Sequence, residues 1–153
     1  MQKLPNFLYD FGMTRINVIP VYELSDQHLI AEYHELPRTL KQKINICDAP
    51  ECYVLGAGHM KWACRHWEYT YNRFTEICNE MRYRGFAVNY DANKLKLYLI
   101  KFLNSDGKYS VSNADIVLNR TRIIEKYNRK PDFYRWTKRQ KPDWLDCRDK
   151  YTI

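Results

Sequence analysis

The stretch Met13–Arg38, MTRINVIPVYELSDQHLIAEYHELPR, decides the fold of this chain. Its second half, from Ser25 to Leu36, has the pattern of a short amphipathic helix, which Pro37 is expected to close or kink. Ser25 is a favourable N-cap, and the aspartate after it suits the helix dipole. Side chains then occupy two arcs: an apolar arc of Leu29, Ile30, Tyr33 and Leu36, and a polar arc of His28, Glu32 and Glu35. Composition alone favours a core-facing helix with a solvated acidic arc.

Positive charge is concentrated near the end of the chain. The 153 residues carry a formal net charge of +7 and a pI near 9.1, which favours a polyanionic partner. Residues 120–153 contain 11 Lys/Arg against 5 Asp/Glu, so most of the excess lies there. The length suits one domain with a real core, and the 45% hydrophobic content argues against a disordered chain. No apolar run approaches the length of a membrane span.

Two further long helices complete the expected core. Residues 59–84 carry apolar side chains at helical spacing, and Gly85 is a natural residue to end that helix. Residues 112–130 repeat the pattern, with a basic stripe on the opposite side formed by Arg122, Lys126 and Arg129. Residues 86–111 fit either a strand or a short helix, and we favour the helix. The sequence therefore predicts an all-α, single compact domain with three principal helices, irregular loops and a basic-aromatic C-terminal tail.

The tail alternates aromatic and basic residues. Within PDFYRWTKRQKPDW, residues 131–144, the aromatic residues are Phe133, Tyr134, Trp136 and Trp144. The basic residues between them are Arg135, Lys138, Arg139 and Lys141. Cations neutralise phosphates and aromatic faces stack on bases, so the composition indicates binding to nucleic acid. Some of the aromatic side chains must belong to the core, and we expect this of Phe133 or Tyr134.

Three motifs, in this order, resemble a known family. MTRIN at residue 13, ELSDQHLIAEYHELPR at residue 23 and LGAGH at residue 55 are similar to the phage-type pyrimidine-dimer DNA glycosylases, endonuclease V of the denV kind. The segments that carry the resemblance are residues 13–38, 53–86 and 116–139. It implies a monomeric enzyme without metal or cofactor that acts on double-stranded DNA carrying ultraviolet-induced pyrimidine dimers.

The resemblance also implies two catalytic residues. In this family the α-amino group of the mature N-terminal threonine is the nucleophile, and a helix glutamate is the second catalytic group. The matching positions are Thr14 and Glu35. An α-amine ordinarily has a pKa of about 8, against about 10.4 for lysine, so more of it is unprotonated near neutral pH. A neutral amine can attack the sugar C1′, displace the base and leave an imine, and the carboxylate can assist the β-elimination that nicks the strand.

The expected DNA contacts combine the family motif with the basic stripe and the tail. They are Arg15, His34, Arg38, Arg122, Lys126, Arg135, Trp136 and Arg139. Two departures from the family weaken this footprint. His34 stands where the family usually has arginine, and a neutral imidazole contributes no counterion release. Residues 39–54 are shorter and less basic than the matching family segment.

Residues 1–12, MQKLPNFLYDFG, fit neither the family pattern nor a secretory signal. While attached, they place the Thr14 nitrogen in a peptide bond, and an amide nitrogen is not a nucleophile. Either translation begins at Met13 and this methionine is removed before the small Thr14, or the extension is trimmed, or the amine is not used; we favour initiation at Met13. The glycosylase/lyase domain is then expected to span residues 13–144 and so to include the basic-aromatic tail of residues 131–144. A separate short C-terminal tail, residues 145–153, is expected to follow it. The expected location is cytoplasmic, or the nucleoid of the host cell if the protein is phage-encoded.

Two other functions stay open. With the extension retained, the protein would be a non-catalytic binder of damaged DNA. A zinc-stabilised nucleic-acid-binding module is the third possibility, because Cys47 and Cys52 could join His59 at a metal. Cys64 and His66 could also contribute ligands. The spacing fits no standard finger, and five cysteines without an export signal are typical of free thiols in a reducing compartment.

Overall fold

The computed structural model describes residues 16–146, and within that range every regular element is helical. The α-helices in this range are α2 (Asp26–Lys41), α3 (His59–Arg65), α4 (Trp67–Arg84), α5 (Ala92–Leu99) and α6 (Asn113–Arg129). Short 3-10 turns accompany them: η1 (Val21–Glu23), η2 (Ile100–Phe102), η3 (Pro131–Phe133) and η4 (Asp143–Asp146). The prediction of an all-α, single compact domain is confirmed.

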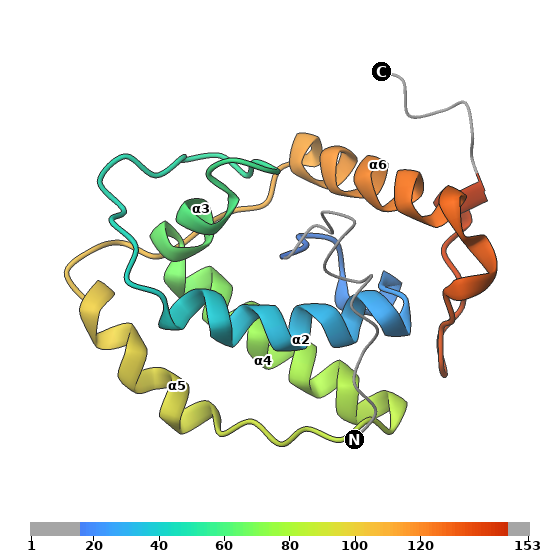
Figure 1. Cartoon of the computed structure of the whole chain (residues 1–153), viewed down its shortest axis with the longest axis horizontal. Coiled ribbons are helices and arrows are strands. Elements are labelled where there is room, and N and C mark those ends of the chain that lie inside the picture. The colour runs from blue at the N-terminus through green and yellow to red at the C-terminus, as the bar shows by residue number, and fades with distance from the viewer. Residues whose placement is uncertain (1–15, 147–153) are drawn as a thin grey trace.

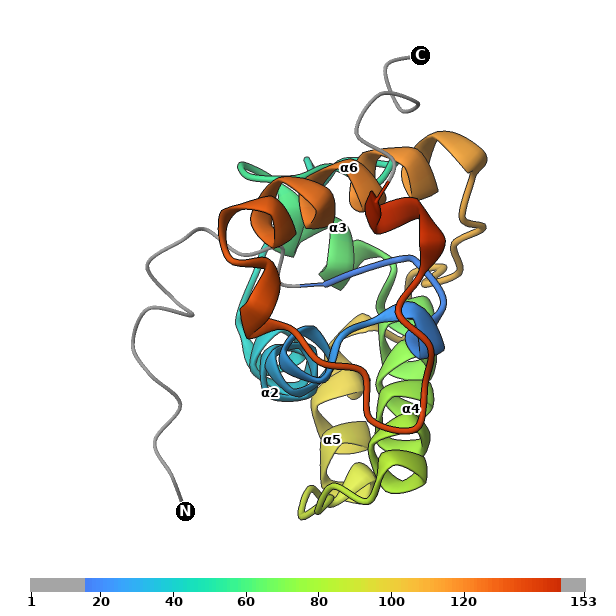
Figure 2. The ribbon, with the colours of Figure 1, turned by 90° about the vertical axis from the view of Figure 1, so that its right-hand side faces the viewer.

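The helices α2 and α4 pack against each other at the centre of the domain (Figure 1). A view turned by 90° shows α2 end-on, with α6 on the opposite side of it from α5 (Figure 2). The extended segment of residues 16–20 runs between α6 and the α2–α4 pair in both views. After α6 the tail passes the N-terminal end of α2, where the Asp26 N–H donates to the Arg135 carbonyl at 2.7 Å.

Helix α2 begins where the sequence indicates and ends later than expected. The Ser25 hydroxyl caps it by accepting the His28 N–H at 3.1 Å. The helix does not close at Pro37 but continues to Lys41. A proline removes its own N–H from the hydrogen-bond ladder, and burial of an apolar side chain in the next turn can offset that loss. That side chain is Leu40, which is fully buried.

The long helix expected over residues 59–84 is interrupted at His66. The backbone there leaves the helical region, with φ −97° and ψ 51°, so α3 and α4 are separate helices. Both ring nitrogens of His66 lie 2.9 Å from carbonyl oxygens, Nδ1 from Lys108 and Nε2 from Glu51. The imidazole therefore connects the loops that contain Glu51 and Lys108 to the point where α3 ends and α4 begins.

The N-terminus of α4 is capped by a segment distant in sequence. The Gly107 carbonyl accepts the N–H groups of Glu68 and Tyr69, both at 3.1 Å. A Cβ at position 107 would lie 2.6 Å from the ring of Trp67, so only glycine permits this approach. At the other end of α4, Gly85 has φ 89° and serves as the cap, as expected.

Residues 86–111 contain the helix that we favoured over a strand. Asp91 caps α5 by accepting the Asn93 N–H at 2.9 Å, and Leu95 and Leu99 face the core. The next helix, α6, begins at a capping box, in which the side chains of Ser112 and Asp115 each accept the other's backbone N–H.

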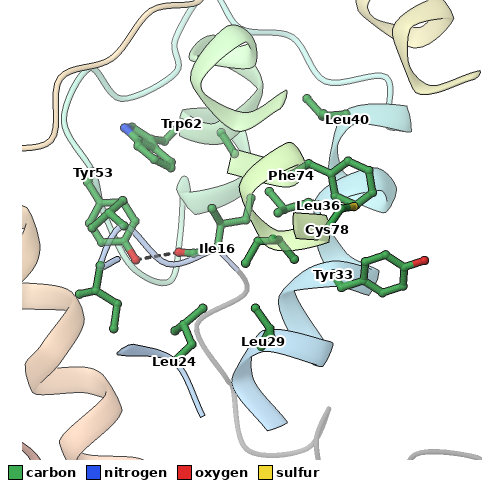
Figure 3. Packing of buried hydrophobic residues seen from close by; sticks show 14 of the residues in the cluster. Ile16, Leu24, Leu29, Tyr33, Leu36, Leu40, Tyr53, Trp62, Phe74 and Cys78 are labelled. Atoms are coloured by element: carbon green, nitrogen blue, oxygen red, sulfur yellow. Dashed lines mark hydrogen bonds between the residues drawn. The ribbon is translucent and has the colours of Figure 1, made fainter. Parts of the chain in front are cut away.

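The core gathers around Trp62 and Phe74, with Leu29, Leu36 and Leu40 of α2 beside them (Figure 3). The tail contributes Trp144, which is 8% exposed. Phe133 or Tyr134 was the expected core aromatic of the tail. Both are half-buried, and Tyr134 packs against the edge of the cluster. The tail is thus part of the domain, not an appendage to it.

Candidate active site

The polar arc of α2 is buried. His28, Glu32 and Glu35 expose 5%, 1% and 9% of their surface. The expectation of a solvated acidic arc is wrong, because Asn17 and Tyr134 pack over this side of the helix. Asn17 hydrogen-bonds to Glu32, and the Tyr134 ring stacks on His28 with centroids 4.9 Å apart.

Glu32 is held in a buried ion pair. Arg73 of α4 donates from Nε to Glu32 Oε2 at 2.8 Å and from Nη2 to Oε1 at 3.2 Å. The Asn17 amide donates to Oε1 at 2.9 Å. Both carboxylate oxygens are therefore occupied, and Glu32 joins α2, α4 and the extended N-terminal segment.

Glu35, one turn further along α2, is placed differently. Its Oε1 lies 3.3 Å from Nη1 of Arg38, whose side chain is 58% exposed. Its Oε2 is buried and has no hydrogen-bond partner within the described chain. A buried carboxylate oxygen without a protein partner is unusual and is available to a substrate.

Lys126 lies inside the site and not on a solvated stripe. The residue is 6% exposed, and its Nζ is buried without a hydrogen-bond partner among residues 16–146. Burial, together with the charges of Arg122 and Arg129, lowers the pKa of Lys126 to about 7. A substantial share of these amines is therefore neutral near neutral pH. The sequence placed Lys126 on a basic stripe with Arg122 and Arg129, and the structure buries its side chain.

His28 is the neighbour of Lys126 across the α2–α6 junction. Burial and the Lys126 amine lower the pKa of His28 to about 3, so its imidazole is neutral at physiological pH. Its Nδ1 lies 3.0 Å from the Ser25 hydroxyl, whereas Nε2 is buried and unpartnered within the part of the chain that is described. His28 and Glu35 are seven residues apart, about two turns, and so share one side of α2. The His28 imidazole and the Lys126 amine, which interact electrostatically, and the Glu35 carboxylate two turns further along α2 each have a buried atom without a hydrogen-bond partner among the described residues.

A hollow of about 480 Å³ lies around Arg38, the ion partner of Glu35; Glu35 itself does not line it. Its lining consists of Tyr33, His34, Pro37, Arg38, Lys41, Asn89 and Tyr90. The Lys41 ammonium lies 4.9 Å from the centroid of the Tyr90 ring. Burial and the charge of Arg38 lower the pKa of His34, which keeps this imidazole neutral. Cationic and aromatic groups thus meet next to the candidate catalytic carboxylate, a combination suited to a nucleotide.

The other predicted DNA contacts are distributed over α6 and the tail. Arg122 is partly exposed, and its Nη1 lies 3.5 Å from Glu125 of the same helix. Arg135 is exposed. Trp136 is half-buried, and its indole N–H donates to the Glu23 carbonyl at 2.9 Å, which fixes the ring orientation.

Arg139 is placed in a different network. Its Nε and Nη2 bind the two oxygens of Glu80 at 2.9 and 2.7 Å. Glu80 also accepts from Arg84, which pairs in turn with Asp26 at the start of α2. A bidentate pair of this kind holds the guanidinium on the protein. Arg139 therefore ties the tail to α4.

Thr14 and Arg15 lie outside the described residues, which begin at Ile16. The segment that follows Thr14 is held by residues that the sequence did not identify. His59 accepts the Ile16 N–H at 3.1 Å, and Asn119 of α6 accepts the Val18 N–H at 2.7 Å. The LGAGH motif was the available signal for His59, whose role the sequence left undecided. No local signal marked Asn119.

Three of the residues considered for zinc, His59, Cys64 and His66, have other partners, whereas Cys47 and Cys52 are exposed free thiols. His59 and His66 engage backbone groups through both ring nitrogens, and the Cys64 thiol donates to the Thr39 carbonyl. The described residues contain no group of three or more His, Cys, Asp or Glu arranged to hold a metal. Over the same residues, no helix is long and apolar enough to cross a membrane.

A family model for pyrimidine dimer DNA glycosylases matches residues 13–94, more than half of the chain. The match contains the polar arc of α2, the hollow beside it and His59. Helix α6 and the tail, which supply Lys126 and Tyr134 to the site, follow the matched segment.

Proposed function

Because the chain belongs to the pyrimidine dimer DNA glycosylase family, we propose that it excises ultraviolet-induced dimers through an imine on the Thr14 α-amine and then nicks the abasic site. The observation that carries this proposal is the buried, unpartnered Oε2 of Glu35. It provides a carboxylate on a helix, and its ion partner Arg38 lines a hollow with the composition of a nucleotide site.

The reaction proceeds in two stages. The neutral α-amine attacks C1′ of the damaged nucleotide, and the base leaves with its bonding electrons and takes up one amine proton. The C1′–O4′ bond then breaks as the nitrogen forms the imine with C1′, and O4′ takes up the second amine proton as a hydroxyl group. The Glu35 carboxylate stabilises the positive charge that develops on the sugar. It then accepts a C2′ proton, and the 3′ phosphate departs by β-elimination. The glycosylase and the abasic-site lyase activities thus share one nitrogen and one carboxylate.

Access to C1′ requires that a nucleotide leave the stack. Extrusion costs a few kcal/mol and is cheapest at a damaged pair, which contributes to selectivity. The hollow lined by Tyr33, Arg38 and Tyr90 is the proposed receptor for an extruded nucleotide. The proposed phosphate contacts are Arg15, Arg38, Arg122, Lys126 and Arg135, with His34 and Trp136 at the edge of the footprint. We leave Arg139 out of the footprint because Glu80 holds it.

The alternative is a non-catalytic binder of damaged DNA. It is favoured if residues 1–12 remain attached, because Thr14 then has no α-amine. The two functions share a DNA-binding surface and differ only in the covalent step.

The test is borohydride trapping on DNA that contains a pyrimidine dimer. Borohydride reduces an imine to a stable amine, so a chain that begins at Thr14 should become locked to the DNA, with the adduct at the Thr14 nitrogen. The chain that begins at Met1 should give little adduct. An adduct formed equally well by the Met1 form, on another residue, would exclude Thr14 as the nucleophile.

The matched control for the carboxylate is Glu35→Gln in the chain that begins at Thr14. This change keeps size and helix propensity and removes the charge. We expect strand cleavage to fall by about 100-fold or more, with DNA binding retained. Wild-type cleavage by Glu35→Gln would refute its role.

A further inference from the structure

The backbone just after the proposed nucleophile is held by side chains and not by secondary structure. Residues 16–19 belong to no helix or strand, yet several of their N–H and C=O groups are bonded to distant parts of the chain. The Tyr53 hydroxyl donates to the Ile16 carbonyl at 2.8 Å (Figure 3). Asn119 Oδ1 accepts the N–H groups of Val18 and Ile19 at 2.7 and 3.2 Å.

We propose that His59 is the positioning residue for the N-terminal amine: its imidazole holds the Ile16 N–H and thereby sets where the nucleophile meets the sugar. This inference rests on the proposed function of Thr14. Of the described backbone groups, the Ile16 N–H is the first along the chain after that residue. His59 is thus the side chain whose bond lies nearest to the attacking nitrogen in sequence.

The hydrogen bonds define the state of the His59 ring. Nδ1 lies 2.7 Å from the Val54 carbonyl oxygen, which can only accept, so Nδ1 carries the proton. Nε2 then has a lone pair and accepts the Ile16 N–H at 3.1 Å. The ring is 5% exposed and packs between Tyr53 and Trp62, with centroids 5.6 and 6.1 Å away. A neutral, enclosed imidazole of this kind has one orientation.

The position of Ile16 limits the reach of the nucleophile. Two residues of extended chain span at most about 7 Å, so fixing Ile16 confines the Thr14 nitrogen to a small volume. A chain end is otherwise among the least ordered parts of a protein. Attack on C1′ tolerates little error, since a misplacement of about 1 Å can cost about 100-fold in rate. An N-terminal nucleophile therefore needs a restraint at its first residues, and His59 lies where that restraint is required.

Two amide variants in the chain that begins at Thr14 separate this role from a purely structural one. In His59→Gln the carbonyl oxygen can reach the position of Nε2 and accept the Ile16 N–H. In His59→Asn the shorter side chain can bond to Val54 but cannot reach Ile16. We expect His59→Gln to keep most of the single-turnover trapping rate and His59→Asn to lose about 100-fold. The Kd for dimer-containing DNA should be unchanged in both.

The opposite order of the two trapping rates would indicate a purely structural role for His59. If His59 only anchors the loop at Val54, the asparagine variant keeps that bond and should be the faster of the two. Equal rates, or a faster asparagine variant, would overturn the proposal. Absence of an adduct from the wild-type chain that begins at Thr14 would instead refute the proposed function itself.

Tyr53→Phe supplies an independent measurement should the His59 variants fail to fold. It keeps the ring in the core and removes only the bond to the Ile16 carbonyl. We expect a fall of about 10-fold in the trapping rate, the loss of one hydrogen bond to the same restraint, at unchanged DNA affinity. A wild-type rate would overturn the proposal.

Discussion

Replacing Glu32 by glutamine should destabilise the fold, although Glu32 lies one turn from Glu35 on the same arc. The change leaves the Arg73 guanidinium, 3% exposed, without its counter-charge. Removing one partner of a buried ion pair costs about 3–5 kcal/mol. Domains of this size have a free energy of unfolding of about 5–15 kcal/mol, so the loss is a large fraction of the total.

Urea denaturation followed by circular dichroism measures this loss directly. With a denaturant slope of about 2 kcal/mol per molar, a loss of 3–5 kcal/mol lowers the midpoint by about 2 M. Glu35→Gln is the matched control. Its ion partner Arg38 is largely exposed, so its midpoint should move by less than about 0.5 M.

A double variant tests whether the uncompensated charge of Arg73 causes the destabilisation. Glu32→Gln with Arg73→Met removes both charges, and the midpoint should recover part of its value, because no uncompensated charge is then buried. A wild-type midpoint in Glu32→Gln, or equal shifts in Glu32→Gln and Glu35→Gln, would contradict the assignment of Glu32 to the fold and of Glu35 to the chemistry.

The remaining predictions concern DNA binding. Because the pKa of Lys126 is about 7, the amine is mostly neutral at pH 8 and charged below pH 6, and a bound phosphate favours the charged form. Binding of DNA at pH 8 should therefore take up close to one proton, which calorimetry in buffers of different ionisation enthalpy can measure. Lys126→Met should abolish this proton uptake. Absence of proton uptake in the wild type would exclude a contact between Lys126 and a phosphate. Arg38→Ala and Arg122→Ala should each reduce the salt slope of binding by about one unit, whereas Arg139→Ala should leave it unchanged. A slope altered by Arg139→Ala alone would show that Arg139 belongs to the footprint and that Arg38 and Arg122 do not.

Local sequence patterns correctly predicted those helices that pack against the core with one face. The Ser25 cap and the apolar arc located α2, and Gly85 marked the end of α4. The break at His66 was not predictable in this way, because it depends on Gly107, which lies 41 residues further along the chain. The continuation past Pro37 also escaped prediction, since it depends on the burial of Leu40 in tertiary packing.

The same distinction between local sequence patterns and tertiary contacts applies to the candidate site. Motif resemblance singled out Glu35, and the structure buries one of its carboxylate oxygens without a partner in the described chain, next to Arg38 at the edge of the hollow. Periodicity grouped Glu32 with it and placed Lys126 on the basic stripe of α6, because periodicity identifies the side of a helix but not what covers that side. Asn17, Tyr134 and the tail provide that cover, and they come from the two ends of the described chain.

The hydrogen bonds between the two ends also bear on how the protein is made. Thr137 donates its N–H to Asp26 across 111 positions, and Asn119 binds Asn17 across 102. Contacts this far apart in sequence form late and slow folding. Since synthesis proceeds from the N-terminus at about 5–20 residues per second, α2 leaves the ribosome early but gains its partners from the tail only when the chain is nearly finished. A nascent chain would therefore carry α2, with the proposed catalytic residue Glu35, for seconds before the rest of the domain could form around it.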